Sequence, residues 1–379
     1  MASRRGVLKL IGGGVVLAAG AGGAYWFMNG PSDEARQAWR EAGQPTEYRR
    51  RFLSYALLAP NPHNRQPWAV KLEGEDALTF YCDLDKRLPE TDPFDRQITL
   101  GCGAFLELLS IAASHSRMRA DITPFPEGEP GERLDKKALA HVRFSSALEP
   151  PDPAFDFILA RRTNRNVYDQ KEVTAQALDE LAAAGSAFGH DVRTTGEGEL
   201  AAKLRDLTWR AHQVEMLNPR TLKESVDLMR IGRAEVNAHR DGLSMEGPVI
   251  EAMHSVGLMT QETMMDVNSV AFKAGMDQFK DKAMSAKAYA WLLSGKPGRA
   301  GQLEAGRAYA RLALKASELN LAIHPWSQSL QEYAEMKPLY DEVHALIGEK
   351  RRIEMLVRVG HADPVEAAPR RGVDDLVKA

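Results

Sequence analysis

The chain has 379 residues, a formal net charge of −3 at pH 7 and only two cysteines. Its 44% hydrophobic and 27% charged residues are typical of a globular protein and exclude a largely disordered one. The near-neutral charge argues against nucleic-acid binding. The lack of Cys-x-x-Cys and His-Glu-x-x-His motifs argues against a metal site. The length suits two units of about 150 residues plus an extra segment.

The N-terminus has the layout of an export signal. Arg4 and Arg5 precede an uncharged, apolar stretch over residues 10–28. Paired arginines before such a stretch resemble the twin-arginine signal, so the twin-arginine translocase is an expected partner. We expect a signal peptide over 1–28, a linker over 29–45, and a protein that is periplasmic or anchored to the outer face of the inner membrane. The stretch also has about the 20 residues that a membrane span needs, so cleavage and anchoring both stay open.

The first half of the chain predicts a mixture of helices and strands. Apolar residues at helical spacing end where Pro60 and Pro62 begin, and two short β-type runs then flank a Gly-Glu-Asp turn. The predicted elements are a helix over 46–59, strands over 68–72 and 78–81, a helix over 98–118, a proline-rich loop over 121–134 and a strand over 139–144.

The second half contains a methionine-rich segment. Predicted elements are helices over 174–184, with Thr174 as N-cap, over 199–217 and over 306–320, and a strand over 353–359. Between them, residues 212–300 read as consecutive helices that form an insertion. Because methionine adapts to irregular surfaces, this insertion is either a mobile cover over a pocket or a plain helical addition.

Two helices repeat at a constant offset of 203 residues. Residues 103–114 align with residues 306–317, and Gly103 and Gly306 are one of the identical pairs. A duplicated fold would place these helices back to back across a pseudo-twofold axis, where small residues allow close packing.

The string Ala59-Pro60-Asn61-Pro62-His63-Asn64-Arg65-Gln66-Pro67-Trp68 is the strongest local motif. It lies between a predicted helix and a predicted strand, and three prolines stiffen it. Asn64 and Gln66 each carry a donor and an acceptor that can read the edge of a planar ring such as a flavin. Amides in tight loops also cap backbone groups, but the complete string favours a binding loop.

Two basic clusters predict a pocket that binds an anion. Arg161-Arg162-Thr163-Asn164-Arg165 combines guanidinium groups with a hydroxyl, and Ala368-Pro369-Arg370-Arg371-Gly372 adds two arginines near the C-terminus. Guanidinium groups pair bidentately with phosphate, so together the clusters suggest one phosphate-binding site.

These motifs resemble those of the nitroreductase flavoprotein family, and of its Acg-like branch. The proline-rich amide loop, the arginine motif, the passage over 307–328 and the closing strand with its basic tail all match. The resemblance implies FMN as cofactor and an α+β fold in which two fused halves, 46–150 and 151–379, each have a central, mainly antiparallel sheet flanked by helices. Asn61 and Pro62 stand where the family has a serine and its neighbour.

The resemblance also implies a set of cofactor-binding residues. The arginine motif and the basic tail would contact the phosphate, and the amide loop would contact the ring. Residues 327–328 would lie near the reactive edge of the ring. The set is Arg161, Arg162, Thr163, Arg165, Asn61, His63, Asn64, Gln66, Ser327, Gln328, Arg370 and Arg371. Each half contributes only one of the two motifs, so the chain is expected to be a pseudo-dimeric monomer with one complete site.

Three functions remain open. In this family the flavin carries the redox chemistry and no catalytic acid or base is obligatory, so the first is reduction of small oxidised compounds such as nitroaromatics or quinones. The electron donor would be NAD(P)H or another reductant. The second is an exported protein that sequesters FMN under a lid with little turnover, and the third is a helical adaptor without a cofactor.

Overall fold

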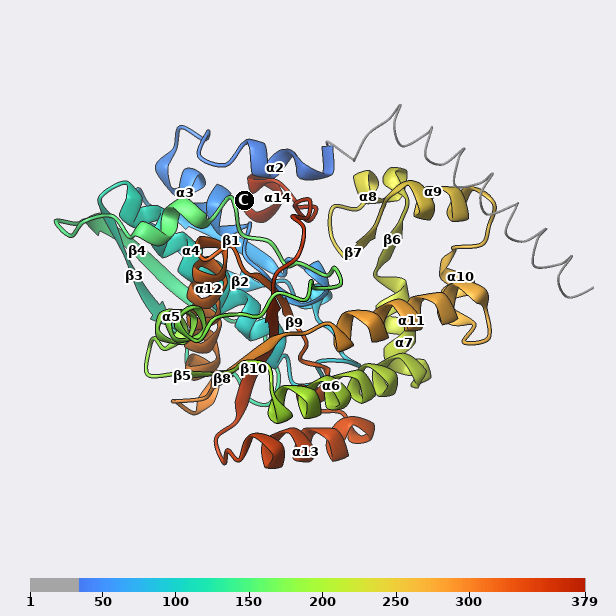
Figure 1. Ribbon diagram of the computed structural model, residues 1–379. Coiled ribbons are helices and arrows are strands. Elements are labelled where there is room, and N and C mark those ends of the chain that lie inside the picture. The colour runs from blue at the N-terminus through green and yellow to red at the C-terminus, as the bar shows by residue number, and fades with distance from the viewer. Residues whose placement is uncertain (1–33, 379) are drawn as a thin grey trace, which may run out of the picture.

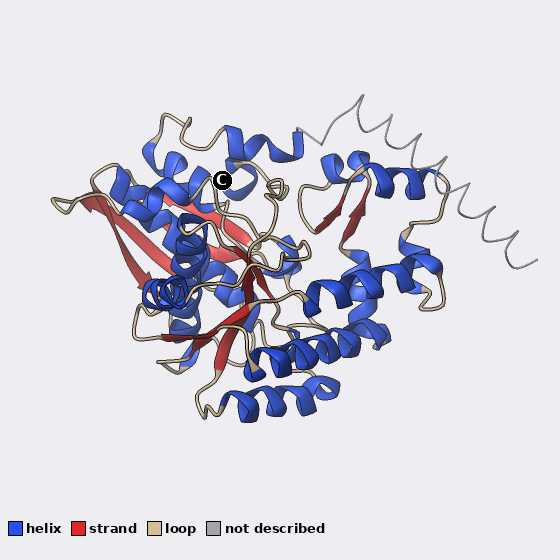
Figure 2. Ribbon diagram, viewed as in Figure 1, coloured by secondary structure: helices blue, strands red, loops and turns tan. Residues whose placement is uncertain are grey.

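The computed structural model describes residues 34–378, so the predicted signal peptide over 1–28 lies outside the described residues. Two four-stranded antiparallel sheets are flanked by helices, which confirms the predicted α+β class (Figure 1). Figure 2 shows these sheets in the left and central part of the view and a mainly helical region on the right.

The first sheet has the strand order β1-β2-β4-β3. Its strands are β1 (Trp68–Glu73), β2 (Ala77–Cys82), β3 (Met118–Pro124) and β4 (Ala140–Ser146). Trp68 pairs with Cys82 and Glu73 with Ala77, so β1 and β2 form the predicted hairpin around residues 74–76. Residues 121–124, predicted as loop, belong to the edge strand β3, because Pro124 ends that strand and interrupts no interior ladder.

The second sheet has the order β5-β8-β10-β9. Its strands are β5 (Asp191–Thr195), β8 (Ala288–Leu293), β9 (Ala322–Pro325) and β10 (Ile353–Gly360). The helices around the two sheets are α3 (Tyr48–Ala56), α4 (Arg96–His115), α5 (Ala175–Gly185), α6 (Glu199–Leu217), α12 (Gly298–Glu318), α13 (Lys337–Ile347) and α14 (Val373–Leu376). The Thr174 side chain accepts a hydrogen bond from the Ala177 amide, which confirms the predicted N-cap of α5.

Helices α4 and α12 pack against each other at the centre of the molecule, as their repeated sequence predicts. A Cβ atom at Gly103 would lie 2.0 Å from the Leu303 carbonyl oxygen, and one at Gly306 would lie 2.0 Å from the Leu100 carbonyl oxygen. The two backbones can therefore meet only because both positions are glycine. Helix α4 is long and apolar enough to cross a membrane, but 83% of its most apolar window is buried, which is typical of a core helix.

Replacing Gly103 with alanine is expected to reduce the free energy of unfolding by about 1–3 kcal/mol, because the new methyl group overpacks the interface. Gly275, inside α11 (Val270–Met284), is the matched control, since its nearest neighbour would be the Met264 methyl group at 3.8 Å. Gly275→Ala is expected to gain about 0.5–1 kcal/mol from helix propensity. Urea unfolding measures both, and a Gly103→Ala protein as stable as wild type would contradict the close packing.

The insertion is shorter than the predicted range of 212–300. Residues 212–217 continue α6, residues 288–293 form the buried strand β8, and α12 starts at residue 298. The inserted elements are α7 (Pro219–Asp227), β6 (Met229–Ile231), α8 (Arg233–Ala238), β7 (Leu243–Met245), α9 (Pro248–Ser255), α10 (Gln261–Met265) and α11. Four methionines contribute to the small core of this region, namely Met216, Met229, Met259 and Met264.

Residues 34–45, predicted as part of a linker, fold onto the rest of the molecule. They form the short helices η1 (Glu34–Arg36) and α2 (Gln37–Arg40). The Trp39 indole donates a hydrogen bond of 2.8 Å to the Ala368 carbonyl, which holds this segment on the C-terminal tail. The remaining short turns are η2 (Pro62–Asn64), η3 (Leu84–Lys86), η4 (Pro153–Phe157), η5 (Gln328–Leu330) and η6 (Ala334–Met336).

Candidate functional site

A cavity of about 220 Å³ lies where the amide loop, the second sheet and the insertion meet. Six of the twelve predicted residues line it, namely Asn61, His63, Thr163, Arg165, Ser327 and Gln328. The wall on the other side comes from α6 and the insertion, with His212, Glu215, Met216, Ser225, Met229, Leu243 and Phe279. A larger depression of about 560 Å³ between α5 and α6 contains none of the predicted residues.

Arg165 is the only arginine of the two predicted basic clusters that lines the cavity. Its guanidinium makes no hydrogen bond or ion pair with any residue from 34 to 378, and its side chain keeps accessible surface. Arg165 is exposed at the cavity wall, while partial burial, with further repulsion from Arg358 and Arg165, lowers the pKa of nearby Lys282 to about 8. Two positive groups without a protein counter-charge favour an anion in this part of the cavity.

Arg358 adds positive charge near Arg165 and holds a histidine in place. Its Nε donates to His324 Nδ1 at 3.2 Å, which leaves the His324 proton on Nε2. The guanidinium also donates to the carbonyls of Lys282 and Asn166 and stacks over the Tyr168 ring at 4.0 Å. Within the described chain, neither Arg165, Lys282 nor Arg358 forms an ion pair with a carboxylate, so the positive charge is uncompensated.

Three histidines line the cavity in their neutral form. Burial, followed by repulsion from Arg165 and Arg65, lowers the pKa of His63 to about 4. Burial and Lys282 lower the pKa of His212 to about 3, and the pKa of His324 also falls well below its ordinary value because of burial and Arg358. At neutral pH these rings offer hydrogen bonds rather than charge. No group of His, Cys, Asp or Glu among residues 34–378 could hold a metal ion.

Two carboxyl groups with raised pKa values also line the cavity. Glu215 receives hydrogen bonds from Ser225 Oγ at 3.3 Å and Gln331 Nε2 at 3.2 Å, and its Oε1 lies 4.0 Å from His63 Nε2. Burial raises the pKa of Glu215 to about 7. Burial also raises the pKa of Asp92 to about 6, although two backbone amides donate to that carboxylate. Both carboxyl groups therefore titrate closer to neutral pH than free carboxyl groups do.

Replacing Glu215 with glutamine is expected to remove a pH-dependent loss of stability. The folded-state pKa of about 7 lies above the ordinary value of 4.5. The folded protein therefore holds the proton more tightly, and its stability falls as the pH rises from 4.5 through 7. The wild type should lose about 3 kcal/mol relative to Glu215→Gln over this range, since one pKa unit corresponds to about 1.4 kcal/mol.

Urea unfolding of both proteins across this pH range measures the difference. Glu199→Gln, at the exposed start of the same helix, is the control and should show no such divergence from wild type. Parallel stability curves for wild type and Glu215→Gln would contradict the raised pKa.

Several buried polar atoms around the cavity have no partner in the described chain. They are His63 Nδ1, both ring nitrogens of His212, Gln328 Oε1 and Gln331 Oε1. Buried polar atoms are normally hydrogen-bonded, so an unpaired set around one cavity indicates a polar ligand. Ser327 differs from these, because its hydroxyl donates to the Leu356 carbonyl and accepts from the Leu356 amide.

Both amides of the predicted ring-binding pair have protein partners, and their contacts to a ring stay a prediction. Asn64 and Gln66 turn away from the cavity and bind the C-terminal tail. Asn64 Nδ2 donates to the Pro369 carbonyl at 3.1 Å, and Gln66 Oε1 accepts from the Arg371 amide at 2.8 Å. His63, Asn64 and Gln66 have φ values of 46°, 52° and 50°, a left-handed conformation that costs energy in non-glycine residues. The amide side chains compensate by fastening this strained loop.

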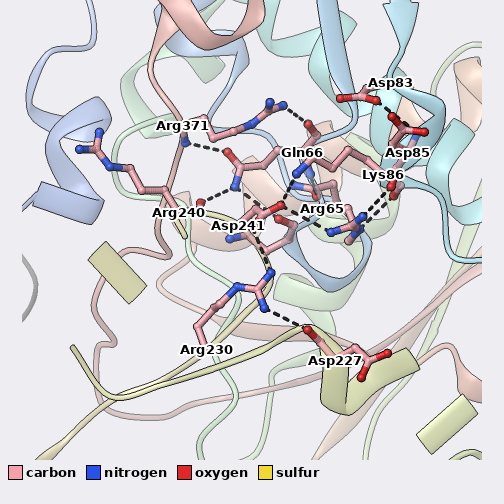
Figure 3. A network of polar contacts seen from close by, with 12 residues as sticks. Arg65, Gln66, Asp83, Asp85, Lys86, Asp227, Arg230, Arg240, Asp241 and Arg371 are labelled. Carbon is pink, nitrogen blue, oxygen red and sulfur yellow. Dashed lines mark hydrogen bonds and ion pairs between the residues drawn. The ribbon is translucent and has the colours of Figure 1, made fainter. Parts of the chain in front are cut away.

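Figure 3 shows that the same loop also holds the insertion in place. Gln66 Nε2 donates to the Arg240 carbonyl at 2.7 Å. The buried Asp241 carboxylate pairs with Lys86 at 2.5 Å, with Arg230 at 3.3 Å and with Arg65 at 3.5 Å. The amide loop therefore joins the tail to the insertion that covers the cavity, and it also contributes Asn61 and His63 to the cavity wall.

The other predicted arginines also bind protein groups. Arg370 donates to the carbonyls of Leu57, Leu58 and Ala59 and to Asn64 Oδ1, while the Arg371 guanidinium donates to the Gln66 carbonyl. Arg161 donates to the Leu58 carbonyl, and Arg162 stacks on the Trp39 ring at 4.5 Å. These four residues do not line the cavity. Backbone carbonyls beyond the end of α3 occupy most donors of Arg370, whereas the Nε atoms of Arg161 and Arg371 are buried without a partner in the described chain. The phosphate contacts of these residues stay a prediction.

Some cavity residues were missed by the sequence motifs. Glu215 and His212 are one helical turn apart on α6, and Phe279 lies on α11, one turn before Lys282, which is near the cavity but does not line it. One signal in the sequence could have found His212 and Glu215. The two polar residues are three positions apart on a helix whose other buried residues are mainly apolar.

No family model matches the chain. Two curated proteins of Mycobacterium tuberculosis (strain H37Rv) are similar to it over most of their length. Acg, a proposed NAD(P)H nitroreductase, is 25% identical over 340 residues, which cover 86% of this chain and 93% of Acg. Rv3131, a second proposed NAD(P)H nitroreductase, is 26% identical over 343 residues, or 87% of this chain and 90% of the relative. The chain resembles these nitroreductase-type proteins, as its motifs predict.

Solved structures show weaker likeness. The FMN-dependent nitroreductase NfnB of Mycobacterium smegmatis, in complex with NADPH, has 19% identity and a TM-score of 0.36, and covers 60% of this chain and 97% of its own. An iodotyrosine deiodinase bound to FMN and 3-iodo-L-tyrosine has 15% identity and a TM-score of 0.33, and covers 57% of this chain and 95% of its own.

Proposed function

We propose that the chain is an FMN-dependent oxidoreductase of the nitroreductase type that reduces small oxidised compounds. The observation that carries the proposal is the unpaired Arg165 guanidinium in a cavity with uncompensated positive charge. Arg165 and the Thr163 hydroxyl would bind the FMN phosphate, with Lys282 and Arg358 contributing charge. The length-wide similarity to two proposed NAD(P)H nitroreductases supports this assignment.

The donor set fits the rest of the cofactor. His63 Nδ1, Gln328 Oε1 and Gln331 Oε1 are buried acceptors or donors in need of partners, which a flavin ring edge can provide. When bound, FMN would accept a hydride equivalent from NAD(P)H or another reductant and pass electrons to a nitroaromatic, a quinone or a similar acceptor. The protein would bind and orient it, and Phe279 and Met229 from the insertion would exclude water.

A second candidate function is storage of FMN with little turnover, and the cavity size favours it. A volume of about 220 Å³ is below the roughly 300 Å³ at which small-molecule sites begin, so a flavin needs the insertion to shift outward. A cover that returns over the ring would restrict access by a nucleotide. The predicted export by the twin-arginine route also supports this candidate, because free NAD(P)H is an intracellular cofactor.

An absorption spectrum of the purified full chain tests both candidates. Flavin absorbance with release of equimolar FMN supports the cofactor. Anaerobic bleaching by NAD(P)H, followed by reoxidation with a quinone or nitroaromatic, supports the oxidoreductase. Bound FMN that no nicotinamide nucleotide reduces supports storage. A colourless protein that FMN cannot reconstitute would overturn both and leave a cofactor-free adaptor.

A further inference from the structure

The outer end of the insertion exposes apolar side chains. Six of the ten exposed large hydrophobic residues in the described chain lie between residues 249 and 284. Four of them, Val256, Leu258, Val267 and Val270, lie in or beside the loops that flank α10, and we call them the apolar tip. These loops lie at the right-hand edge of the molecule in Figure 1. Val270 is 77% exposed, which is unusual for a side chain that gains by leaving water.

The N-terminal segment enters the structure beside the same insertion. The Ala35 amide donates to Asn237 Oδ1 at 3.1 Å, and Arg36 pairs with Glu246 at 2.7 Å. The uncharged stretch over 10–28 ends only six residues before Glu34. Six residues span at most about 20 Å when fully extended. A bilayer that holds the stretch therefore lies close to the insertion and on its side of the molecule.

We propose that the apolar tip is a membrane-binding surface, which enters the interfacial region of the lipid bilayer that holds residues 10–28. Glu262 and Asp266 lie among the tip residues in the sequence, so binding depends on burial of apolar area rather than on attraction to anionic headgroups. The proposal does not depend on a flavin.

Membrane contact at the tip reaches the cavity through one helix. Helix α11 begins at Val270 and carries Phe279 in the cavity wall. The two residues are about 14 Å apart along the helix axis, at 1.5 Å per residue. A displacement of the tip in the bilayer therefore moves the cavity cover.

Fluorescent labels on the full chain in phosphatidylcholine vesicles test the proposal. Val256→Cys and Val270→Cys introduce labelling sites, while the native Cys82 and Cys102 are buried. Leu148→Cys, which is 99% exposed in the loop after β4, is the control. Brominated lipid should quench the labels at 256 and 270, and iodide should not. At 148, iodide should quench the label and brominated lipid should not. Added salt should leave the pattern unchanged.

Two outcomes would overturn the proposal. Iodide quenching at 256 and 270 as strong as at 148 would place the tip in water. Protection from iodide without quenching by brominated lipid would show that protein, such as a second copy of the chain, covers the tip. Both outcomes are independent of FMN content, so they are distinguishable from a failure of the proposed function.

Discussion

Replacing Arg165 with alanine is expected to weaken FMN binding by about tenfold to a hundredfold. A hydrogen bond to a charged group contributes about 1.5–3 kcal/mol, and each 1.4 kcal/mol is tenfold in affinity. Arg165 makes no hydrogen bond or ion pair within residues 34–378, so none is lost in the variant. Riboflavin lacks the phosphate, and its affinity should stay unchanged. Titration of both flavins by fluorescence quenching measures the loss.

Arg162→Ala is the matched control for this experiment. Arg162 belongs to the same motif but stacks on Trp39 and donates to two backbone carbonyls outside the cavity. FMN affinity should therefore stay close to that of wild type. An equal loss for FMN and riboflavin in Arg165→Ala would show that Arg165 supports the fold or the ring and does not bind phosphate.

Replacing Arg370 with alanine is expected to reduce the free energy of unfolding by about 3–5 kcal/mol, as for other buried charged groups whose partners are left behind. The change leaves the carbonyls of Leu57, Leu58 and Ala59 and the Asn64 side chain without this hydrogen-bond donor. Burial already holds the pKa of Arg370 well below its ordinary value, so these hydrogen bonds are what retain the charge. Thermal and urea unfolding measure the effect.

Arg50→Ala is the control for stability, because Arg50 pairs with the exposed Asp374 on the surface next to the same tail. Such pairs contribute about 0–1 kcal/mol. In folded Arg370→Ala protein, the ratio of FMN to riboflavin affinity should equal that of wild type. A fall in this ratio with little loss of stability would contradict the structural role and show that Arg370 binds the FMN phosphate.

The strongest local patterns of the sequence predicted much of the fold. The hairpin of β1 and β2, the Thr174 cap and the repeated glycines of α4 and α12 all follow from neighbours in the chain or from a short repeat. Strand β8 was missed because residues 288–293 are buried on both faces. A short, continuously apolar run does not alternate, so periodicity cannot separate it from a helix.

The sequence by itself determined which chemical groups are present: clustered arginines, side-chain amides and a stiff proline-rich loop. Only the tertiary structure decided which of these groups remain free for a ligand. Arg165 and Arg370 are the same residue type in similar clusters. Arg165 lines the cavity, whereas the Arg370 guanidinium donates hydrogen bonds to backbone carbonyls. Asn64 and Gln66 were likewise taken by the tail and the insertion. A donor binds the nearest acceptor in space, and that acceptor comes from residues more than 170 positions away in the chain.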